Sequence, residues 1–317
     1  MPLTRRAFVR TLFVASQTAV LNELLPRSLF AATPAPGTLN FAVIGDWGHP
    51  GPTDQPAVAH QMGIACQKAS AKFVISVGDN FYNNGVTSVT DPRFQQSFEN
   101  IYTAPSLQVP WYLVLGNHDY NGNCDAQIAY SKTNKRWNMP ARYYSKVHDV
   151  DAETKVEIFH IDTCPMVIAY QNDLKMKDIR QQDTKVQLAW LNQALAASTA
   201  PWKLVVGHHP IYSSGLGHGT QPELVERVLP LLEKHKVQAY FAGHDHDLEH
   251  LQTGTLNLFI SGGGFEHRPM RDLPQSKFAD PSISGFAMAS LSANELNISL
   301  VDSLGNTIYS TSVPRVS

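Results

Sequence analysis

The sequence predicts an α+β protein in which two mixed β-sheets pack together and helices cover them on the outside. Residues 39–77 read as strand, helix and strand, the pattern of a parallel pair. From Leu256 onward the apolar pattern is purely β. No internal repeat of fixed period and no clear domain boundary divides the chain, so one large domain is expected.

Apolar runs and helical stripes place the individual elements. The first predicted helix, residues 57–70, carries its stripe on Val58, Met62, Ala65 and Ala69. A later helix is capped by Asp183 and buries leucines, whereas Gln171–Gln182 is charged and polar and is expected to be an exposed loop. The other predicted helices are Arg93–Tyr102, Ala126–Lys132 and Pro222–His235. The predicted strands are Leu39–Ile44, Phe73–Val77, Trp111–Leu115, Arg142–Val147, Lys155–Ile161, Lys203–Val206, Val237–Ala242, Leu256–Ile260, Gly285–Leu291, Leu296–Leu300 and Thr307–Thr311.

The N-terminus reads as a targeting segment. Arg5 and Arg6 precede a modest apolar stretch, Thr11–Leu25, and small residues follow around Ala32. A paired arginine, a weak hydrophobic region and a small-residue cleavage site are typical of a twin-arginine export signal. The apolar stretch is too short and too interrupted to span a bilayer comfortably, so no stable membrane insertion is expected after cleavage. We therefore predict a signal peptide at 1–32, a linker at 33–37, a domain at 38–317 and a periplasmic or secreted location.

Composition limits the partners of the domain. The 317 residues are 43% hydrophobic, which allows a large buried core. The net charge is −2 and no basic run is present, so no nucleic-acid partner is expected. Three cysteines, Cys66, Cys124 and Cys164, form no CxxC motif, which argues against a zinc–thiolate site. One disulfide could form after export, but the pairing and the oligomeric state stay open.

Five strand ends carry polar motifs of the same kind. Each follows an apolar run and contains Asp, Asn or His, the residues that bind hard metal ions through oxygen and imidazole nitrogen. The motifs are Gly45-Asp46-Trp47-Gly48, Gly78-Asp79-Asn80-Phe81-Tyr82, Gly116-Asn117-His118-Asp119, Gly207-His208-His209-Pro210 and Gly243-His244-Asp245-His246. One such strand end is commonly only a turn, but five together predict a site for a pair of metal ions. Such a pair polarises a phosphoryl oxygen and lowers the pKa of a bound water.

These motifs, in this order, resemble those of the purple acid phosphatases in the metallophosphoesterase superfamily, especially the tartrate-resistant acid phosphatase type. The similarity extends over roughly residues 38–265 and includes Asp91-Pro92-Arg93-Phe94-Gln95 and Lys135-Arg136-Trp137-Asn138. It implies a four-layer αββα sandwich. It also implies an acid phosphatase that hydrolyses phosphate monoesters by attack of a metal-bound hydroxide.

The resemblance also implies a ligand set. Asp46, Tyr82 and His246 would bind a first metal, Fe(III), and Asp79 would bridge to a second. The second metal, Fe(II), Zn or Mn, would take three further side chains, and two histidines would contact the substrate. The second set is Asn117, His208 and His244, and the substrate histidines are His118 and His218, the latter with one extra residue in its loop.

Tyr82 distinguishes the purple type from other metallophosphoesterases. Many members of the superfamily have a ligand His two residues after the first Asp, but here that position is Gly48. The purple type has a tyrosine ligand instead, and a phenolate is a hard anionic donor that favours Fe(III).

Two other functions fit part of the pattern. A metallophosphodiesterase acting on nucleotides or lipids would use the same metals, and rates on p-nitrophenyl phosphate and its bis ester would separate the two. A non-catalytic metal- or phosphate-binding protein would keep the ligands without turnover. The triplet Gly262-Gly263-Gly264 lacks the lysine of a P-loop and is expected to let the backbone pass close to the metals.

Overall fold

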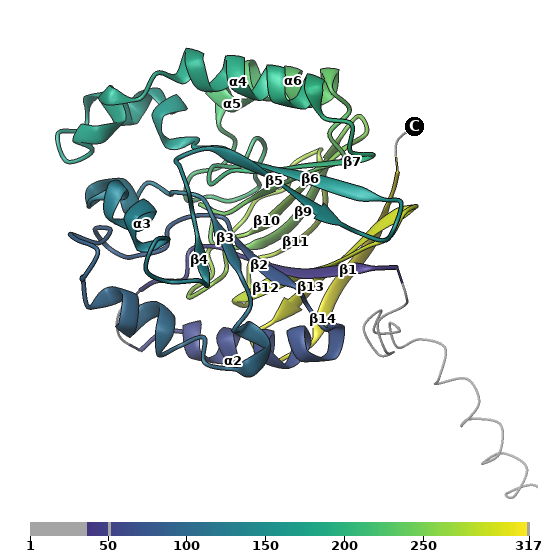
Figure 1. The fold of residues 1–317 in the computed structure, drawn as a ribbon, viewed down its shortest axis with the longest axis horizontal. Coiled ribbons are helices and arrows are strands. Elements are labelled where there is room, and N and C mark those ends of the chain that lie inside the picture. Colours follow the sequence, from purple (N-terminus) through teal and green to yellow (C-terminus); the bar gives the residue numbers. More distant parts are fainter. Residues whose placement is uncertain (1–36, 50–51, 316–317) are drawn as a thin grey trace, which may run out of the picture.

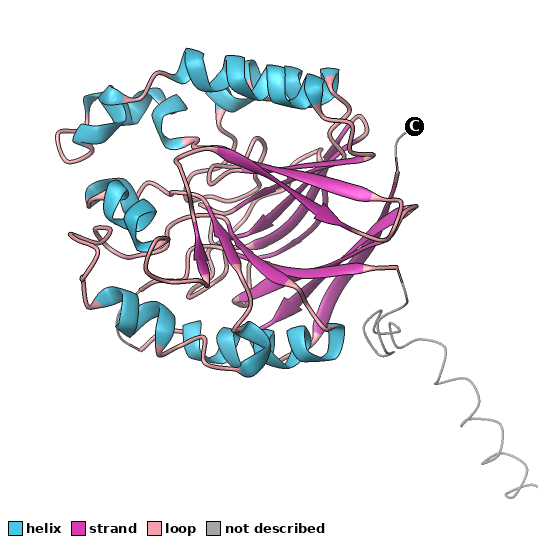
Figure 2. Ribbon diagram, in the orientation of Figure 1, coloured by secondary structure: helices cyan, strands magenta, loops and turns pink. Residues whose placement is uncertain are grey.

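The structure is a computed structural model that describes residues 37–49 and 52–315. The predicted signal peptide and all of the linker except Gly37 lie outside these residues. Two seven-stranded sheets face each other, and helices cover their outer faces (Figure 1). Coloured by secondary structure, the layers run helix, sheet, sheet, helix (Figure 2). The predicted αββα sandwich is therefore confirmed.

The first sheet joins the two ends of the described chain. Its order is β14-β13-β12-β1-β2-β3-β4, with β1 to β4 parallel and β12 to β14 antiparallel. Strand β1 lies between β2, where Phe41 pairs with Phe73, and β12, where Phe41 pairs with Ala289. The strands are β1 (Leu39–Ile44), β2 (Phe73–Ser76), β3 (Trp111–Leu113), β4 (Trp137–Asn138), β12 (Gly285–Leu291), β13 (Glu295–Asp302) and β14 (Thr307–Pro314).

The second sheet is built from the middle of the chain. Its order is β11-β9-β10-β8-β7-β6-β5, with a parallel centre of β6, β7, β8 and β10. Parallel strands need crossover connections, and helices supply several of them. The strands are β5 (Tyr144–Asp149), β6 (Lys155–His160), β7 (Trp202–Val206), β8 (Ala239–Ala242), β9 (Leu248–Thr253), β10 (Leu256–Ser261) and β11 (Ser276–Asp280).

Helices cover the outer face of each sheet (Figure 1). Helix α2 covers the first sheet, and the helices α4, α5 and α6 cover the second. The α-helices are α2 (Gln55–Ala69), α3 (Cys124–Tyr130), α4 (Thr184–Ala197), α5 (Pro222–Arg227) and α6 (Leu229–Lys234). A π-helix spans Phe94–Glu99, and 3-10 helices span Pro105–Leu107, Asp119–Asn121, Cys164–Met166, Ile168–Asn172 and Lys177–Gln181. No helix of the described residues is long and apolar enough to cross a membrane.

The strand β1 shows how the layers are held together. Its side chains alternate between two apolar clusters, as the two-residue period of a strand requires. Phe41 and Val43 pack in the cluster between the sheets, whereas Ala42 and Ile44 pack in the cluster that includes Met62 of α2. A strand buried on both faces is mostly apolar, which explains the hydrophobic run from Phe41 to Ile44, and the one buried polar side chain, Asn40, donates a hydrogen bond to the carbonyl oxygen of Ala69.

Two histidines, the buried His160 and the partly buried His148, lie at one edge of the sandwich. His160 on β6 stacks on Tyr144 at 4.4 Å between ring centroids, and His148 on β5 stacks on Phe73 at 4.3 Å. Neither ring nitrogen of His160 has a hydrogen-bond partner among the described residues. Burial, with a smaller contribution from His148, lowers the pKa of His160 to about 3.

Some predicted elements differ from the structure. The predicted helix Pro222–His235 is two helices, because Pro230 has no N–H to continue the first of them. The predicted exposed loop Gln171–Gln182 contains the short helix Lys177–Gln181, which buries Ile179 in the core. The strands β4, β9 and β11 were missed, and the predicted helix Arg93–Tyr102 is the shorter π-helix. All three cysteines are buried and free.

Candidate metal centre

The predicted ligands gather where the strands of both sheets end. Asp46, Asp79 and Asn117 follow the parallel strands β1, β2 and β3, so they lie at one edge of the first sheet. His208 follows β7, and His244 follows the neighbouring parallel strand β8, so they lie at one edge of the second sheet. The edges meet across the sandwich, because His208 Nδ1 donates to the carbonyl oxygen of residue 77 at 2.9 Å. Ligand side chains from both sheets therefore face one centre.

Four donor atoms surround the first predicted metal position. The Tyr82 hydroxyl lies 2.9 Å from Asp46 Oδ1, 2.9 Å from Asp79 Oδ2 and 3.2 Å from His246 Nε2. His246 Nε2 is 3.5 Å from Asp46 Oδ1. Two ligand atoms at right angles, each about 2.1 Å from one ion, are about 3 Å apart. The spacing of these four atoms therefore fits a single metal ion.

A second group shares Asp79 with the first. His208 Nε2 lies 3.5 Å from Asp79 Oδ2 and 3.1 Å from Asn117 Oδ1. The rings of His208 and His244 have centroids 5.0 Å apart. Ligand atoms of Asp46, Asp79 and His208 all lie within 4.8 Å of one another. Because one Asp79 oxygen approaches both groups, that carboxylate can bridge two ions.

The electrostatics of the cluster favour cations. Burial opposes a charged imidazole at His208, but the Asp79 and Asp46 carboxylates outweigh it and raise the pKa of His208 to about 9. At His246 the carboxylates of Asp46 and Glu266 likewise outweigh burial and raise the pKa to about 9. Burial, with the charges of Asp46 and Asp79, raises the pKa of the Tyr82 phenol well above 10. A phenol in this position ionises only against strong positive charge, which a multivalent metal ion provides.

Three of the predicted ligand residues have a left-handed backbone. Their φ angles are +55° at Asp46, +50° at Asp79 and +71° at His244. This conformation is rare for residues other than glycine and costs on the order of 1–3 kcal/mol each. The strain turns the chain sharply at each strand end and directs the side chain toward the shared centre.

Asp119 ties two ligand loops together. Its buried carboxylate accepts hydrogen bonds from the backbone N–H groups of Asn80, Phe81 and Gly116, at 3.1, 3.2 and 2.8 Å. The amide groups of Asn80 and Gln127 donate to it as well. Asp119 thereby fixes the loop after β2 against the loop after β3. No sequence pattern indicated that Asp119 joins these two loops, although the residue stands in the Gly116–Asp119 motif.

The two predicted substrate histidines lie beside the cluster. His118 keeps about 30% of its side chain exposed, with Nε2 4.0 Å from Asp79 Oδ2. Its Nδ1 donates to the carbonyl oxygen of Asn83 at 2.8 Å, so Nε2 is the ring nitrogen on the side of Asp79. The His218 ring stacks on His244 at 3.9 Å between centroids. The extra residue in the His218 loop therefore does not remove this side chain from the cluster.

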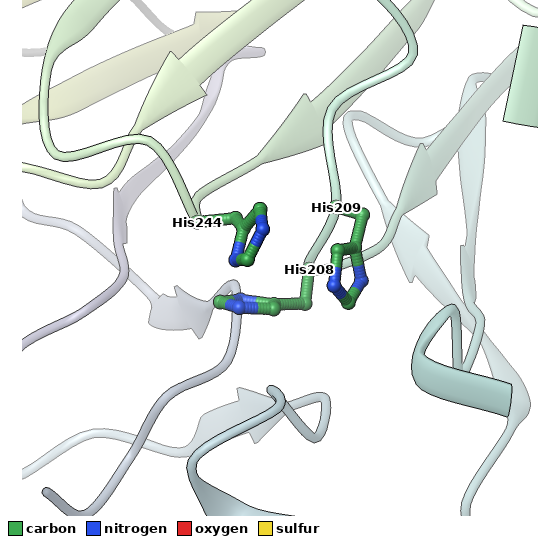
Figure 3. A group of neighbouring side chains, drawn as sticks. All are labelled: His208, His209 and His244. Carbon is green, nitrogen blue, oxygen red and sulfur yellow. The ribbon is translucent and has the colours of Figure 1, made fainter. Parts of the chain in front are cut away.

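His209 borders the centre but has other partners. His208 and His209 leave the same segment in different directions, with His244 on a separate loop across from them (Figure 3). Ligand atoms of these three histidines lie within 4.8 Å of one another. However, His209 Nδ1 is 2.8 Å from the Thr163 hydroxyl and Nε2 is 3.2 Å from that of Tyr170. Both ring nitrogens are thus engaged outside the centre.

Two features near His246 complete the site. Glu266 Oε1 lies 2.6 Å from His246 Nδ1, and no sequence motif pointed to this carboxylate. The His246 ring, by its hydrogen bond, holds the pKa of Glu266 at about 2. A Cβ on Gly264 would lie 2.3 Å from the carbonyl oxygen of Gly45, so only glycine fits there. The backbone after β10 therefore passes close to the Asp46 loop, as the sequence predicts.

Comparisons with known proteins point to one family. The model of the calcineurin-like phosphoesterase family matches residues 39–248. The chain is 37% identical over 315 residues to tartrate-resistant acid phosphatase type 5 of Homo sapiens. This alignment covers 92% of this chain and 95% of that protein. It is 38% identical over 321 residues to purple acid phosphatase 4 of Arabidopsis thaliana, with coverage of 96% and 92%.

Solved structures show the same architecture. The structure described as GAP50, the anchor in the inner membrane complex of Plasmodium, superposes with a TM-score of 0.77 at 27% identity, covering 88% of this chain and 90% of that one. The purple acid phosphatase PPD1 of yellow lupin (Lupinus luteus) seeds superposes with a TM-score of 0.63 at 16% identity, covering 90% of this chain and 55% of that one. At 16% identity, the similarity to the yellow lupin protein shows a shared fold alone.

Proposed function

The chain belongs to the calcineurin-like phosphoesterases and, within them, to the purple acid phosphatases, and from this premise we propose how its residues perform the reaction. It is an acid phosphatase with a dinuclear metal centre. Asp46, Tyr82 and His246 would hold the first metal, Fe(III), and Asp79 would be shared with the second. Asn117, His208 and His244 would hold the second metal, Fe(II), Zn or Mn.

The spacing around the Tyr82 hydroxyl carries this proposal. Two carboxylate oxygens and one imidazole nitrogen lie 2.9 to 3.2 Å from it, close enough to share one ion. When bound, the metals supply the charge that polarises the phosphoryl oxygen and the hydroxide that attacks phosphorus. The chain's own contribution is to fix the two ions through Asp79 and to surround them with buried donors.

His118 orients the phosphate monoester. Its Nδ1 is fixed by the carbonyl oxygen of Asn83, and its partly exposed ring directs Nε2 to the space above Asp79. Because Nδ1 donates to Asn83, Nε2 carries a proton only in the imidazolium form, and in that form it can donate to a phosphate oxygen. His218, stacked on His244, would contact the ester from the side of the second metal group. Together the two imidazoles hold the ester between them.

Export by the twin-arginine route completes the proposal. It rests on Arg5 and Arg6, the interrupted apolar stretch and the small residues around Ala32. Cleavage there would release the domain of residues 38–317 into the periplasm or the medium.

Metal analysis, a visible spectrum and a phosphate-ester screen on one purified sample test this function. We expect two metal ions per chain, a visible band in the oxidised iron form and faster hydrolysis of p-nitrophenyl phosphate than of its bis ester. Preference for the bis ester would indicate the phosphodiesterase alternative. Two bound metals without hydrolysis of any phosphate ester would indicate the non-catalytic alternative.

A further inference from the structure

Glu266 and Arg268 lie between a predicted metal ligand and a predicted substrate residue. We infer that they form a positioning pair, in which Glu266 orients His246 toward the first metal and Arg268 holds Glu266 while facing His218. This inference rests on the proposed ligand set. It adds two residues that belong to none of the five strand-end motifs.

The hydrogen bond to Glu266 orients the His246 ring. Glu266 is a carboxylate, so at 2.6 Å the proton of this hydrogen bond resides on His246 Nδ1. The other nitrogen, Nε2, is then the one left to bind a metal, and it faces Asp46 Oδ1 at 3.5 Å and the Tyr82 hydroxyl at 3.2 Å. Metal-binding histidines usually have such an outer partner, which fixes the ring and makes its nitrogen a stronger donor. Glu266 therefore selects the form of His246 that can bind a metal.

Arg268 in turn holds the Glu266 carboxylate in place. Arg268 donates from Nε and Nη2 to the same Glu266 oxygen, at 2.9 and 2.6 Å. The backbone N–H of Arg268 also donates to the carbonyl oxygen of His246 at 2.8 Å. These contacts limit both the rotation of the carboxylate and its distance from the ring. Arg268 is thus placed to keep Glu266 on His246.

Arg268 also approaches the predicted substrate residue His218. The remaining guanidinium nitrogen of Arg268, Nη1, lies 3.5 Å from His218 Nε2. The His218 ring in turn stacks on His244 of the second metal group. The pair therefore reaches from a proposed ligand of the first metal to the histidine that stacks beside the second.

Because both side chains are partly exposed, the effect of the pair on the metal centre can be measured separately from its effect on folding stability. The side chains of Glu266 and Arg268 are about 40% and 37% exposed. Exposed ion pairs contribute little to folding stability, so their removal should leave the fold intact. Loss of a partner behind a metal ligand, by contrast, typically costs about 10- to 100-fold in metal affinity or activity.

Glu266→Gln tests the charge, because the amide keeps the length and a hydrogen-bond acceptor. Glu266→Ala removes the partner entirely. The iron affinity of each variant is measured by competition with a chelator, and its Fe(III)/Fe(II) reduction potential by spectroelectrochemical titration. We expect about a 10-fold loss of Fe(III) affinity in Glu266→Gln, a larger loss in Glu266→Ala and a positive shift of the potential in both. The shift is positive because the negative charge of Glu266 stabilises Fe(III) more than Fe(II).

Arg268→Gln and a matched control complete the experiment. Arg268→Gln should shift the potential in the same direction but less, and should raise KM more than it lowers kcat, because Glu266 remains while His218 loses its neighbour. Glu99→Gln removes the carboxylate of another ion pair, 3.0 Å from Arg136, whose partners do not include the centre. It should leave iron affinity and potential unchanged.

Wild-type values in both Glu266 variants, or equal shifts in Glu99→Gln, would overturn the inference. If Glu266→Gln does not fold, as judged by circular dichroism, a wild-type potential and KM in Arg268→Gln would overturn it alone. Failure of the proposed function looks different, because the wild-type protein itself would then lack iron and phosphatase activity.

Discussion

Replacement of His160 by phenylalanine should make the protein more resistant to acid. The imidazole is fully buried, and burial lowers its pKa from 6.5 to about 3 in the folded state. Phenylalanine has a similar ring and can keep the stacking on Tyr144. It has no nitrogen that must take up a proton when the chain unfolds.

The sign and size follow from the two pKa values. The unfolded chain binds a proton below about pH 6.5, whereas the folded protein resists it until about pH 3, so the His160 contribution is complete above pH 6.5 and is lost as the pH falls. At pH 5 the loss relative to pH 8 is about 2 kcal/mol. His160→Phe should therefore gain about 2 kcal/mol over the wild type at pH 5, beyond any difference between them at pH 8.

Urea unfolding of both proteins at pH 5 and pH 8 measures this quantity. The difference between the two pH values removes the packing effect of the new ring, which is the same at both. His60→Phe, at an exposed position of α2, is the control for exchanging a histidine for phenylalanine. A pH-dependent gain below about 0.5 kcal/mol in His160→Phe would refute the reasoning, because it would mean that the folded protein protonates His160 readily.

Four further predictions concern the metal centre and export. Tyr82→Phe should abolish the visible band of the oxidised iron protein, since the phenolate donates the charge; an unchanged band at equal iron content would exclude Tyr82 as a ligand. His208→Ala should retain one metal ion per chain and lose most activity, because its metal keeps only neutral ligands besides the bridge; two ions by elemental analysis would point to another ligand. Asp119→Ala should lower the free energy of unfolding by several kcal/mol, since three buried N–H groups lose their acceptor, each worth about 1–3 kcal/mol; a change below about 1 kcal/mol in urea unfolding would contradict the loop-tying role. Replacing both Arg5 and Arg6 by lysine should leave active enzyme in the cytoplasm, and undiminished periplasmic activity would argue against the twin-arginine route.

The strand ends could be predicted because their signal is local. Each is a short apolar run followed at once by glycine and a polar residue, and parallel pairing then brings several of them to one edge. The alternation of Phe41 and Val43 with Ala42 and Ile44 reflects burial on both faces, which the unbroken apolar run also indicates. The positions of Asp46, Asp79, Tyr82 and the histidines follow directly from those strands.

Other features depend on contacts between distant segments. Glu266 contacts His246, which lies twenty residues away, and no spacing rule connects the two. The break between α5 and α6 had a local signal in Pro230, which the helical stripe of the surrounding residues masked. The short strand β4 has only two residues, too few to show a period. Burial of Ile179 likewise depends on tertiary packing of a mostly polar segment.

The pairing of β1 determines when the centre can assemble. During synthesis, a chain emerging from the ribosome shows Asp46, Asp79 and Asn117 early, but its imidazole ligands appear only from His208 onward. Strand β1 gains its second neighbour later still, when residues 285–291 of β12 emerge and pair with it. Long-range pairing of this kind is slow, and neither half of the chain alone contains the full proposed ligand set. If these residues bind the metals, uptake of both ions is expected only after β12 has paired with β1, which would suit the proposed export of an already folded protein.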